Sequence, residues 1–405
     1  MNRKKKVDTW MKPRHKIITM LAKCVIKPYT IWKYGLHIEK FKNQGKRPYL
    51  ILANHQTPFD QFFVALTFKG PIYYLATEDI FSLGFLSTLL KWAVGPIPIR
   101  KQATDIIAVK NCIKVAKEGG TIAIFPEGNR TYSGQTEYMN PTIASLAKKI
   151  KLPIAFLRIE GGYGIEPRWS DSPRKGKMRC YVSKVLEPEE YSNLTNDELF
   201  SIIEENLYVN EAVADAEFTH PARAEYLERL FYVCPYCGLT TFESHGHTIE
   251  CKQCGKQMTY ETNKQFSGVG FDFPHRFVLD WYNYQNDFIN QLDLNEYFDK
   301  TMYQDQAKLS EVIVYKQKNL LKDEATISLY GNKIVIDENK DSALTLLFDD
   351  ISTVSVLGKN KLNIYHKKEI YQIKGNKRFN AVKYTNIYHR YLNMRGGNNG
   401  KFLGL

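Results

Sequence analysis

The sequence lacks an apolar run long enough to cross a membrane as a helix. The apolar stretch nearest its start, residues 17–26, covers about ten residues and is interrupted by Lys23, whereas a bilayer requires about 20. No cleavage pattern of a secretory signal peptide accompanies this stretch. We therefore expect neither a signal peptide nor a clear transmembrane helix.

A missing motif and a shortage of acidic residues restrict the possible classes of function. No Gly-x-Ser-x-Gly segment occurs, so the main signal of an α/β-type serine hydrolase is missing. Acidic residues are outnumbered, with 43 aspartates and glutamates against 56 lysines and arginines, and the net charge is +13. This excess favours an anionic partner. The chain of 405 residues, of which 43% are hydrophobic, is long enough for two or three packed domains.

Polar residues gather in four short segments, each at the end of an apolar run. The segments are NHQTPFD (54–60), GPIPIR (95–100), FPEGNR (125–130) and LPI (152–154). Strand-like runs at 49–53, 72–75, 121–125 and 153–157 alternate with helix-like stretches such as 105–118. The pattern predicts an α/β fold with a mostly parallel sheet flanked by helices. Ligands gather beyond the carboxyl ends of such strands, so the polar segments should share one sheet edge.

These four segments resemble the glycerolipid acyltransferase family of the lysophosphatidic acid type, over roughly residues 30–210. The resemblance implies transfer of a fatty acyl group from an acyl-CoA or acyl carrier protein thioester to the free hydroxyl of a lysophosphatidic acid-type acceptor, in phospholipid biosynthesis. It implies that His55 is the general base and that Asp60 orients it. It also implies that Arg100, Glu127, Gly128 and Arg130 help to bind the acceptor's phosphate.

The chemistry requires these residue types independently of the resemblance. A hydroxyl is a poor nucleophile, and a neutral imidazole can accept its proton as it attacks a thioester. A carboxylate on the other ring nitrogen fixes the tautomer, and an arginine fork matches phosphate oxygens in pairs. An ion pair between Arg130 and the nearby Glu127 is the structural alternative for that arginine.

Three positions depart from the family pattern and leave the acceptor open. Ile99 stands where an aspartate is common, Asn129 replaces a threonine, and Phe156 replaces a second proline. Remodelling of a lysophospholipid that already carries a head group is therefore an alternative reaction. A basic loop follows at 167–177, for which we weigh a solvated role against contact with anionic head groups.

A second signal is a set of four cysteines in two Cys-x2-Cys pairs separated by 13 residues. These are Cys234, Cys237, Cys251 and Cys254. The spacing resembles a zinc ribbon and predicts a structural zinc site, because four thiolates leave no open coordination position for catalysis. Two disulfides are the alternative. The remaining cysteines, Cys24, Cys112 and Cys180, lie in apolar runs and are predicted to be buried.

The start of the chain is strongly basic and then amphipathic. Residues 1–16 contain seven lysines and arginines against Asp8 alone, and apolar residues of 17–26 fall on one helical face. This pattern predicts peripheral binding to a membrane surface with anionic lipids, on the cytoplasmic face. Because lysine clusters attract any phosphate, nucleic acid is an alternative partner, and the sequence favours a lipid surface over it.

The sequence after residue 215 predicts a zinc ribbon, an aromatic-rich helical segment and a β domain. Aromatic residues of 271–292 have helical spacing and are expected to pack in a core. Short β-like runs from 311 to 373, closed by a helix near 381–391, resemble a pleckstrin-homology or GRAM-like domain. A binding protein with an inactive α/β domain is the non-enzymatic alternative. The expected division is 1–36 membrane-surface segment, 37–215 acyltransferase domain, 216–265 zinc ribbon, 266–308 aromatic-rich helical linker, 309–395 β domain and 396–405 flexible tail.

Overall fold

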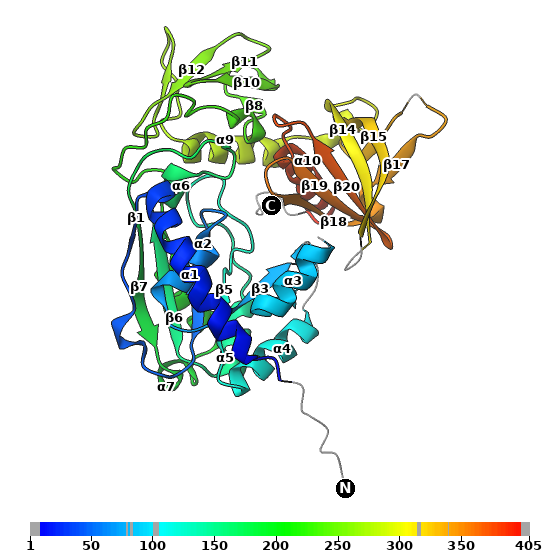
Figure 1. Ribbon diagram of the computed structural model, residues 1–405. Coiled ribbons are helices and arrows are strands. Elements are labelled where there is room, and N and C mark those ends of the chain that lie inside the picture. The colour runs from blue at the N-terminus through cyan, green and yellow to red at the C-terminus, as the bar shows by residue number, and fades with distance from the viewer. Residues whose placement is uncertain are drawn as a thin grey trace.

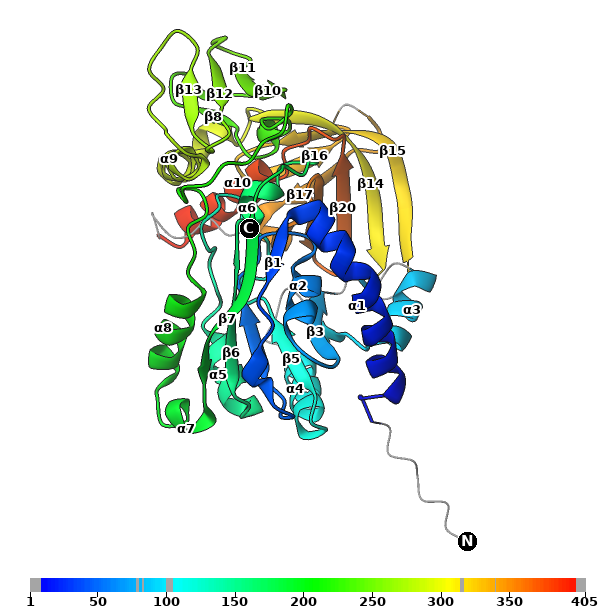
Figure 2. The same ribbon diagram turned by 60° about the vertical axis from the view of Figure 1, so that its left-hand side comes forward.

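The computed structural model describes residues 9–77, 80–81, 84–99, 105–313, 317–338 and 340–397. Within these residues the chain forms two large sheets, a four-stranded sheet and a two-stranded pair. Figures 1 and 2 show the first large sheet with its helices below the other elements, and the second large sheet above it to one side.

The first large sheet, called the α/β sheet below, has the strand order β1-β7-β6-β2-β5-β3-β4 among the described residues. Its strands are β1 (Leu36–Ile38), β2 (Leu50–Ala53), β3 (Ile72–Thr77), β4 (Ile97–Ile99), β5 (Thr121–Ile124), β6 (Ile154–Glu160) and β7 (Met178–Leu186). Every neighbouring pair is parallel except β6 and β7, which are antiparallel. The expected α/β fold with a mostly parallel sheet is confirmed.

Helices cover both faces of the α/β sheet. They are α1 (Pro13–Tyr34), α2 (Asp60–Thr67), α3 (Phe85–Val94), α4 (Ile106–Lys117), α5 (Thr142–Ile150), α6 (Gly162–Ile165), α7 (Pro188–Tyr191) and α8 (Asn196–Leu207). Successive strand residues point to opposite faces. In β2, Leu50 and Leu52 therefore join the core beneath α4, α5 and α8, whereas Ile51 and Ala53 join the core beneath α2 and the end of α1.

The cysteine-containing segment forms small antiparallel strands followed by a helix. The elements are β8 (Val233–Cys234), β9 (Gly238–Leu239), β10 (Phe242–His245), β11 (Thr248–Cys251), β12 (Gln257–Tyr260), β13 (Phe266–Gly268) and α9 (Val278–Gln291). Trp281 of α9 is fully buried and stacks on Phe231, with ring centroids 3.8 Å apart. The aromatic segment therefore packs in a core, as expected.

The second large sheet, called the C-terminal sheet below, is antiparallel, with the order β17-β16-β15-β14-β20-β19-β18 in the described chain. Its elements are β14 (Tyr303–Ile313), β15 (Gln317–Leu329), β16 (Lys333–Ile336), β17 (Leu344–Leu347), β18 (Ile351–Leu357), β19 (Lys361–His366), β20 (Glu369–Gly375) and the closing helix α10 (Val382–Arg395). The predicted run of strands closed by one helix is confirmed. Strand β14 begins at Tyr303, inside the stretch expected as a linker, and the domain boundaries remain predictions.

Four short 3₁₀ segments complete the described elements: η1 (Lys42–Gln44), η3 (Leu227–Arg229), η4 (Leu294–Tyr297) and η5 (Phe348–Asp350).

One continuous core joins the ribbon strands, α9 and the C-terminal sheet. Tyr132 and Trp169, which lie in loops that follow strands of the α/β sheet, belong to this same core. The loops at the carboxyl ends of β5 and β6 are therefore held by the ribbon and the C-terminal sheet as well as by their own sheet.

Burial corrects two sequence expectations. Cys112 and Cys180 are buried as predicted, but Cys24 is exposed because it lies on the outward face of α1. In the basic loop 167–177, Arg168 and Arg174 are each only 2% exposed, so the solvated reading is wrong for these two arginines.

Candidate active site and metal centre

His55 and Asp60 meet where strand β2 ends and helix α2 begins. The His55 Nδ1 atom lies 2.8 Å from the Asp60 Oδ2 atom. Just before the histidine, the Asn54 side chain makes two hydrogen bonds of 2.8 Å with the backbone of Ile159 in β6. The histidine therefore leaves the sheet at a point where two strands are joined, and its ring is oriented by the carboxylate.

The Asp60 carboxylate is fully buried and has several donors besides His55. Its Oδ2 atom accepts from the N–H groups of Gln56 at 2.6 Å and Thr57 at 3.0 Å. Its Oδ1 atom accepts from the Thr57 hydroxyl at 2.6 Å. These hydrogen bonds hold the carboxylate in place beside the imidazole, where it can stabilise an imidazolium.

The His55 imidazole packs against an aromatic ring and is partly exposed. The His55 ring stacks on Phe125, with centroids 4.4 Å apart and an interplanar angle of 25°. The His55 side chain is 20% exposed. Its Nε2 atom has no hydrogen bond within the described residues, which leaves that atom available to a ligand.

Glu127 ties the loop after β5 to the histidine. Its Oε1 atom accepts from the His55 N–H at 2.8 Å, and its Oε2 atom accepts from the Glu137 N–H at 2.9 Å. The N–H of Thr131 donates to the His55 carbonyl at 3.1 Å. Both carboxylate oxygens are thus occupied by backbone donors, which favours a positioning role for Glu127 over direct contact with phosphate.

Gly128 and Arg130 lie in the same loop. Gly128 is exposed, has a φ of +66° that favours glycine, and has open space where a side chain would be. The Nη1 atom of Arg130 is buried and has no hydrogen-bond partner in the described part of the chain. Burial, with the positive charge of Arg168, lowers the pKa of Arg130 to about 10. Arg130 therefore remains a cation at neutral pH and does not form the expected alternative pair with Glu127.

Two further arginines concern this site: Arg100 from its sequence segment and Arg168 from its contacts. Arg100 lies outside the described residues. Arg168 belongs to the basic loop for which the sequence leaves open both a solvated role and contact with anionic head groups. Its guanidinium donates to the Arg130 carbonyl at 3.1 Å and lies 4.1 Å from the Tyr132 ring centroid. A residue pattern does not reveal this contact, because it joins loops after two different strands.

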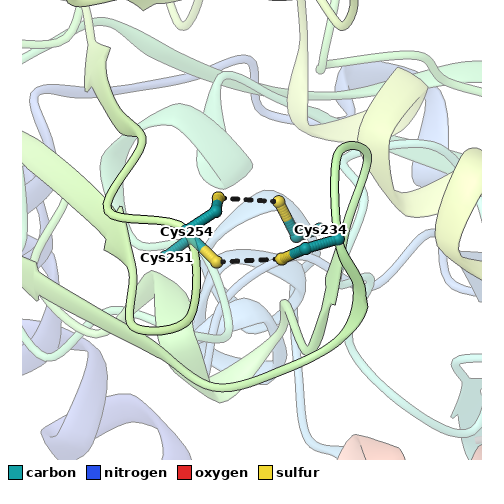
Figure 3. A group of neighbouring side chains, drawn as sticks. Cys234, Cys251 and Cys254 are labelled. Atoms are coloured by element: carbon teal, nitrogen blue, oxygen red, sulfur yellow. Dashed lines mark hydrogen bonds between the residues drawn. The ribbon is translucent and has the colours of Figure 1, made fainter.

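The four cysteines of the ribbon converge as their spacing predicts. Their sulfur atoms all lie within 4.8 Å of one another, with Cys234 to Cys254 at 3.8 Å and Cys237 to Cys251 at 3.5 Å (Figure 3). A zinc ion with Zn–S bonds of about 2.3 Å requires sulfur–sulfur edges of about 3.8 Å. The cysteines are free thiols, so the alternative of two disulfides is not what the structure contains.

An apolar surface covers helices α1 and α3. These helices contact each other, and the Arg14 Nε atom donates to the Trp92 carbonyl at 2.8 Å. The exposed side chains, called the α1/α3 surface below, are Ile17, Met20, Leu21, Val25, Tyr29, Ile31 and Trp32 of α1 and Phe85, Leu86, Leu89 and Trp92 of α3. In the ranges that the structure describes, we find no helix with both the length and the apolar character needed to span a bilayer.

Comparison with known proteins identifies the α/β part of the chain. Residues 35–159 match the family model described as Acyltransferase. This stretch contains β1 to β6 together with His55, Asp60, Glu127, Gly128 and Arg130. It is an acyltransferase-family domain.

Several relatives are 1-acyl-sn-glycerol-3-phosphate acyltransferases. The Bacillus subtilis protein is 25% identical over 36% of this chain and 69% of its own length. The Saccharomyces cerevisiae protein is 24% identical over 39% of this chain and 52% of its own length. The chloroplastic Arabidopsis thaliana protein is 22% identical over 47% of this chain and 53% of its own length. The chain thus spans about half the length of the last two relatives.

The chain is also similar to a solved structure over part of its length. The 1-acyl-sn-glycerophosphate (LPA) acyltransferase PlsC from Thermotoga maritima has 22% sequence identity and a TM-score of 0.41, and the match covers 48% of this chain and 80% of that one.

Glu127 should make the free energy of unfolding depend on pH. Burial raises the pKa of its carboxyl group from 4.5 to about 8, against the opposing N–H donors of Glu137 and His55. The folded state then holds this proton more tightly than the unfolded state. The resulting stability is full below pH 4.5 and is lost as the pH rises through about 8.

We therefore expect the stability of the wild type relative to Glu127→Gln to fall as the pH rises from about 5 to about 9, measured by urea unfolding. The exposed Glu205→Gln is the matched control and should leave the pH dependence as it is in the wild type. Parallel pH profiles for the wild type and Glu127→Gln would contradict the assigned pKa shift.

Proposed function

We propose that this chain is an O-acyltransferase that moves a fatty acyl group from an acyl-CoA or acyl carrier protein thioester to the free hydroxyl of a lysophosphatidic acid-type acceptor. The observation that carries the proposal is the 2.8 Å contact between His55 Nδ1 and the buried Asp60, within an acyltransferase-family domain. The names of the relatives support a phosphate-bearing acyl-glycerol as the acceptor.

The proposed reaction needs one base and no acyl-enzyme. The acceptor hydroxyl gives its proton to His55 Nε2 while its oxygen attacks the thioester carbonyl carbon. When the tetrahedral intermediate collapses, the carbon–sulfur bond breaks, and the thiolate takes the proton back from Nε2. Asp60 stabilises the imidazolium that exists between these steps.

The acceptor's phosphate would be held beside this base. Arg130 supplies a cation whose Nη1 atom has no partner among the described residues, and the loop that carries it is bound to the His55 backbone through Glu127 and Thr131. An arginine fork suits a phosphate with two free oxygens. Gly128 leaves open space at the mouth of the same loop. We assign Arg100 to the same role from the family resemblance alone.

We propose a structural zinc ion at the four cysteines. The sulfur separations of 3.8 and 3.5 Å agree with the edges of a tetrahedral tetrathiolate site. When bound, zinc would cross-link the Cys234–Cys237 turn to the Cys251–Cys254 turn. Cys234 and Cys251 belong to the core that the ribbon shares with the C-terminal sheet, so metal binding would stabilise both.

We propose that the α1/α3 surface binds the cytoplasmic face of a membrane peripherally. Helix α1 turns its apolar side outward, whereas Lys23 points inward and donates to the Phe68 carbonyl at 2.8 Å. Burial and the nearby Lys40 lower the pKa of Lys23 to about 8. An outward apolar stripe with the excess positive charge of the chain suits an anionic lipid surface.

Acyl transfer should depend on His55. We expect His55→Ala to lower kcat by about 10²–10⁴ fold, because the hydroxyl loses its proton acceptor. The measurement follows thiol release and lipid product with acyl-CoA or acyl carrier protein thioester, and with acceptors from glycerol 3-phosphate to head-grouped lysolipids. The exposed His37→Ala is the control and should retain activity. Full activity in His55→Ala would remove His55 as the base, and activity restricted to head-grouped acceptors would favour the remodelling reaction.

Metal analysis should find about one zinc ion per chain, as a tetrathiolate site requires. Replacement of one ligand, as in Cys251→Ser, should lower zinc content well below that value and lower the unfolding temperature, because metal binding is coupled to folding. The exposed Cys24→Ser should keep the wild-type zinc content. A stable wild-type protein that binds no zinc from metal-containing medium would refute the site.

Vesicle binding should depend on the α1/α3 surface. The double variant Trp32→Ser and Phe85→Ser removes side chains that are 81% and 83% exposed, and it should reduce co-sedimentation with anionic phospholipid vesicles. Binding by the wild type should also weaken between about 0.1 M and 1 M salt, as charges are screened. The control is Val269→Ser, which replaces an exposed apolar residue just after β13. Unchanged binding by the double variant would place the membrane contact elsewhere.

A further inference from the structure

The turn between strands β18 and β19 of the C-terminal sheet contacts the loop that follows β6 of the α/β sheet. The Arg168 guanidinium joins the two. Its Nη2 atom donates to the Val356 carbonyl at 3.2 Å and its Nε atom donates to the Gly358 carbonyl at 3.4 Å, while Nη1 donates to the Arg130 carbonyl at 3.1 Å. One buried side chain thus links the backbone of Arg130 to a strand turn that lies 188 to 190 residues beyond Arg168 in the chain.

A second cation of the same turn is fixed by an ion pair. The Lys359 Nζ atom donates to the Ser170 carbonyl and lies 3.0 Å from Asp171 Oδ1. Asp171 also accepts from two nitrogens of Arg229, at 2.9 and 2.8 Å. Burial opposes ionisation of Asp171, but the hydrogen bonds from Arg229 and Lys359 prevail and lower its pKa to about 2. The turn therefore has a defined position at neutral pH.

The two carboxylates that raise the pKa of Arg130, those of Glu166 and Asp60, already accept hydrogen bonds from other groups. The nearby carboxylate of Glu166 is engaged by the Tyr34 hydroxyl at 2.6 Å and by Lys33 at 3.3 Å. Arg168 and Lys359 add positive charge beside Arg130, whose Nη1 atom has no partner within the described ranges. A buried N–H group of a cation without a hydrogen-bond partner is costly unless a ligand supplies an acceptor.

We propose that the C-terminal sheet completes the acceptor site: Arg168 positions Arg130, and Lys359 of the β18–β19 turn strengthens the positive field that binds a phosphomonoester. This inference rests on the proposed function. A phosphomonoester carries a charge of about −1.5 to −2 at pH 7, so it gains more from added positive charge than a head group with no net charge does. The turn therefore contributes to preference for a lysophosphatidic acid-type acceptor over head-grouped lysolipids.

Arg168 is suited to this positioning role for a geometric reason. Its planar fork reaches three carbonyl groups on two elements at once, whereas a lysine ammonium is a single point charge on a flexible stem. Arg168→Lys keeps the charge and loses the three-way link. Lys359→Ala removes a charge but keeps Arg168. The two variants thus distinguish loss of the contact that positions Arg130 from loss of positive charge near it.

The test is steady-state kinetics of the full chain with saturating acyl donor and two acceptors, 1-acylglycerol 3-phosphate and 1-acylglycero-3-phosphocholine. We expect Arg168→Lys to raise the KM for the phosphomonoester about tenfold, which corresponds to about 1.4 kcal/mol, with little change in kcat. Lys359→Ala should lower the preference for the phosphomonoester by several fold. Lys361→Ala removes the same charge two residues away on the same hairpin and should behave as wild type.

Three outcomes overturn the inference. They are an equal KM for the phosphomonoester in wild type and both variants, an equal fall in kcat for both acceptors, and equal behaviour of Lys361→Ala and Lys359→Ala. The second outcome would mean that the contact only stabilises the fold. Lys359 is partly exposed, so Lys359→Ala remains informative if Arg168→Lys does not fold.

Failure of the proposed function is distinguishable from failure of this inference. A wild type that acylates neither acceptor would refute the former. In that case, inorganic phosphate is the probe: stabilisation of the wild type against thermal unfolding, reduced in both variants but not in Lys361→Ala, supports an anion site built from two sheets. Equal stabilisation of all four proteins, or none, refutes it.

Discussion

The buried carboxylate of Asp60 is the group on which the candidate active site depends. It accepts hydrogen bonds from the His55 ring, from the N–H groups of Gln56 and Thr57 and from the Thr57 hydroxyl. The same anion thus orients the imidazole and closes the turn between β2 and α2. Because it is compensated by protein donors before any ligand arrives, little reorganisation is needed when the imidazole becomes charged.

The surroundings of this carboxylate come from distant parts of the chain. Strands β2 and β5 are parallel neighbours, so their carboxyl ends bring His55 and Glu127 to one edge, where the Glu127 side chain accepts from the His55 backbone. The C-terminal sheet approaches that edge through Arg168, and Tyr132 and Trp169 join its core. The site and the C-terminal sheet therefore share contacts, and a substitution at these contacts in either part should alter the structure of the other.

Helix α1 turns much of its apolar side away from the rest of the protein. The inward Lys23 donates to carbonyls beyond the end of α2, and its apolar neighbours Leu21 and Val25 remain exposed. A helix in a water-soluble monomer usually turns its apolar side to the core. The opposite arrangement here supports the proposed membrane contact, which would bring a lipid acceptor close to a site built from the adjoining loops.

The sequence by itself determined the α/β class, the strand ends that carry His55, Asp60 and Glu127, and the gathering of the four cysteines, because these follow from short spacing and from the common direction of parallel strands. It did not reveal the role of Arg168, the structural use of both Glu127 oxygens or the exposure of Cys24. Those were decided only by tertiary structure. Whether a charged or apolar side chain is paired, buried or outward depends on which loop or sheet packs against it, and such contacts join residues far apart in the chain.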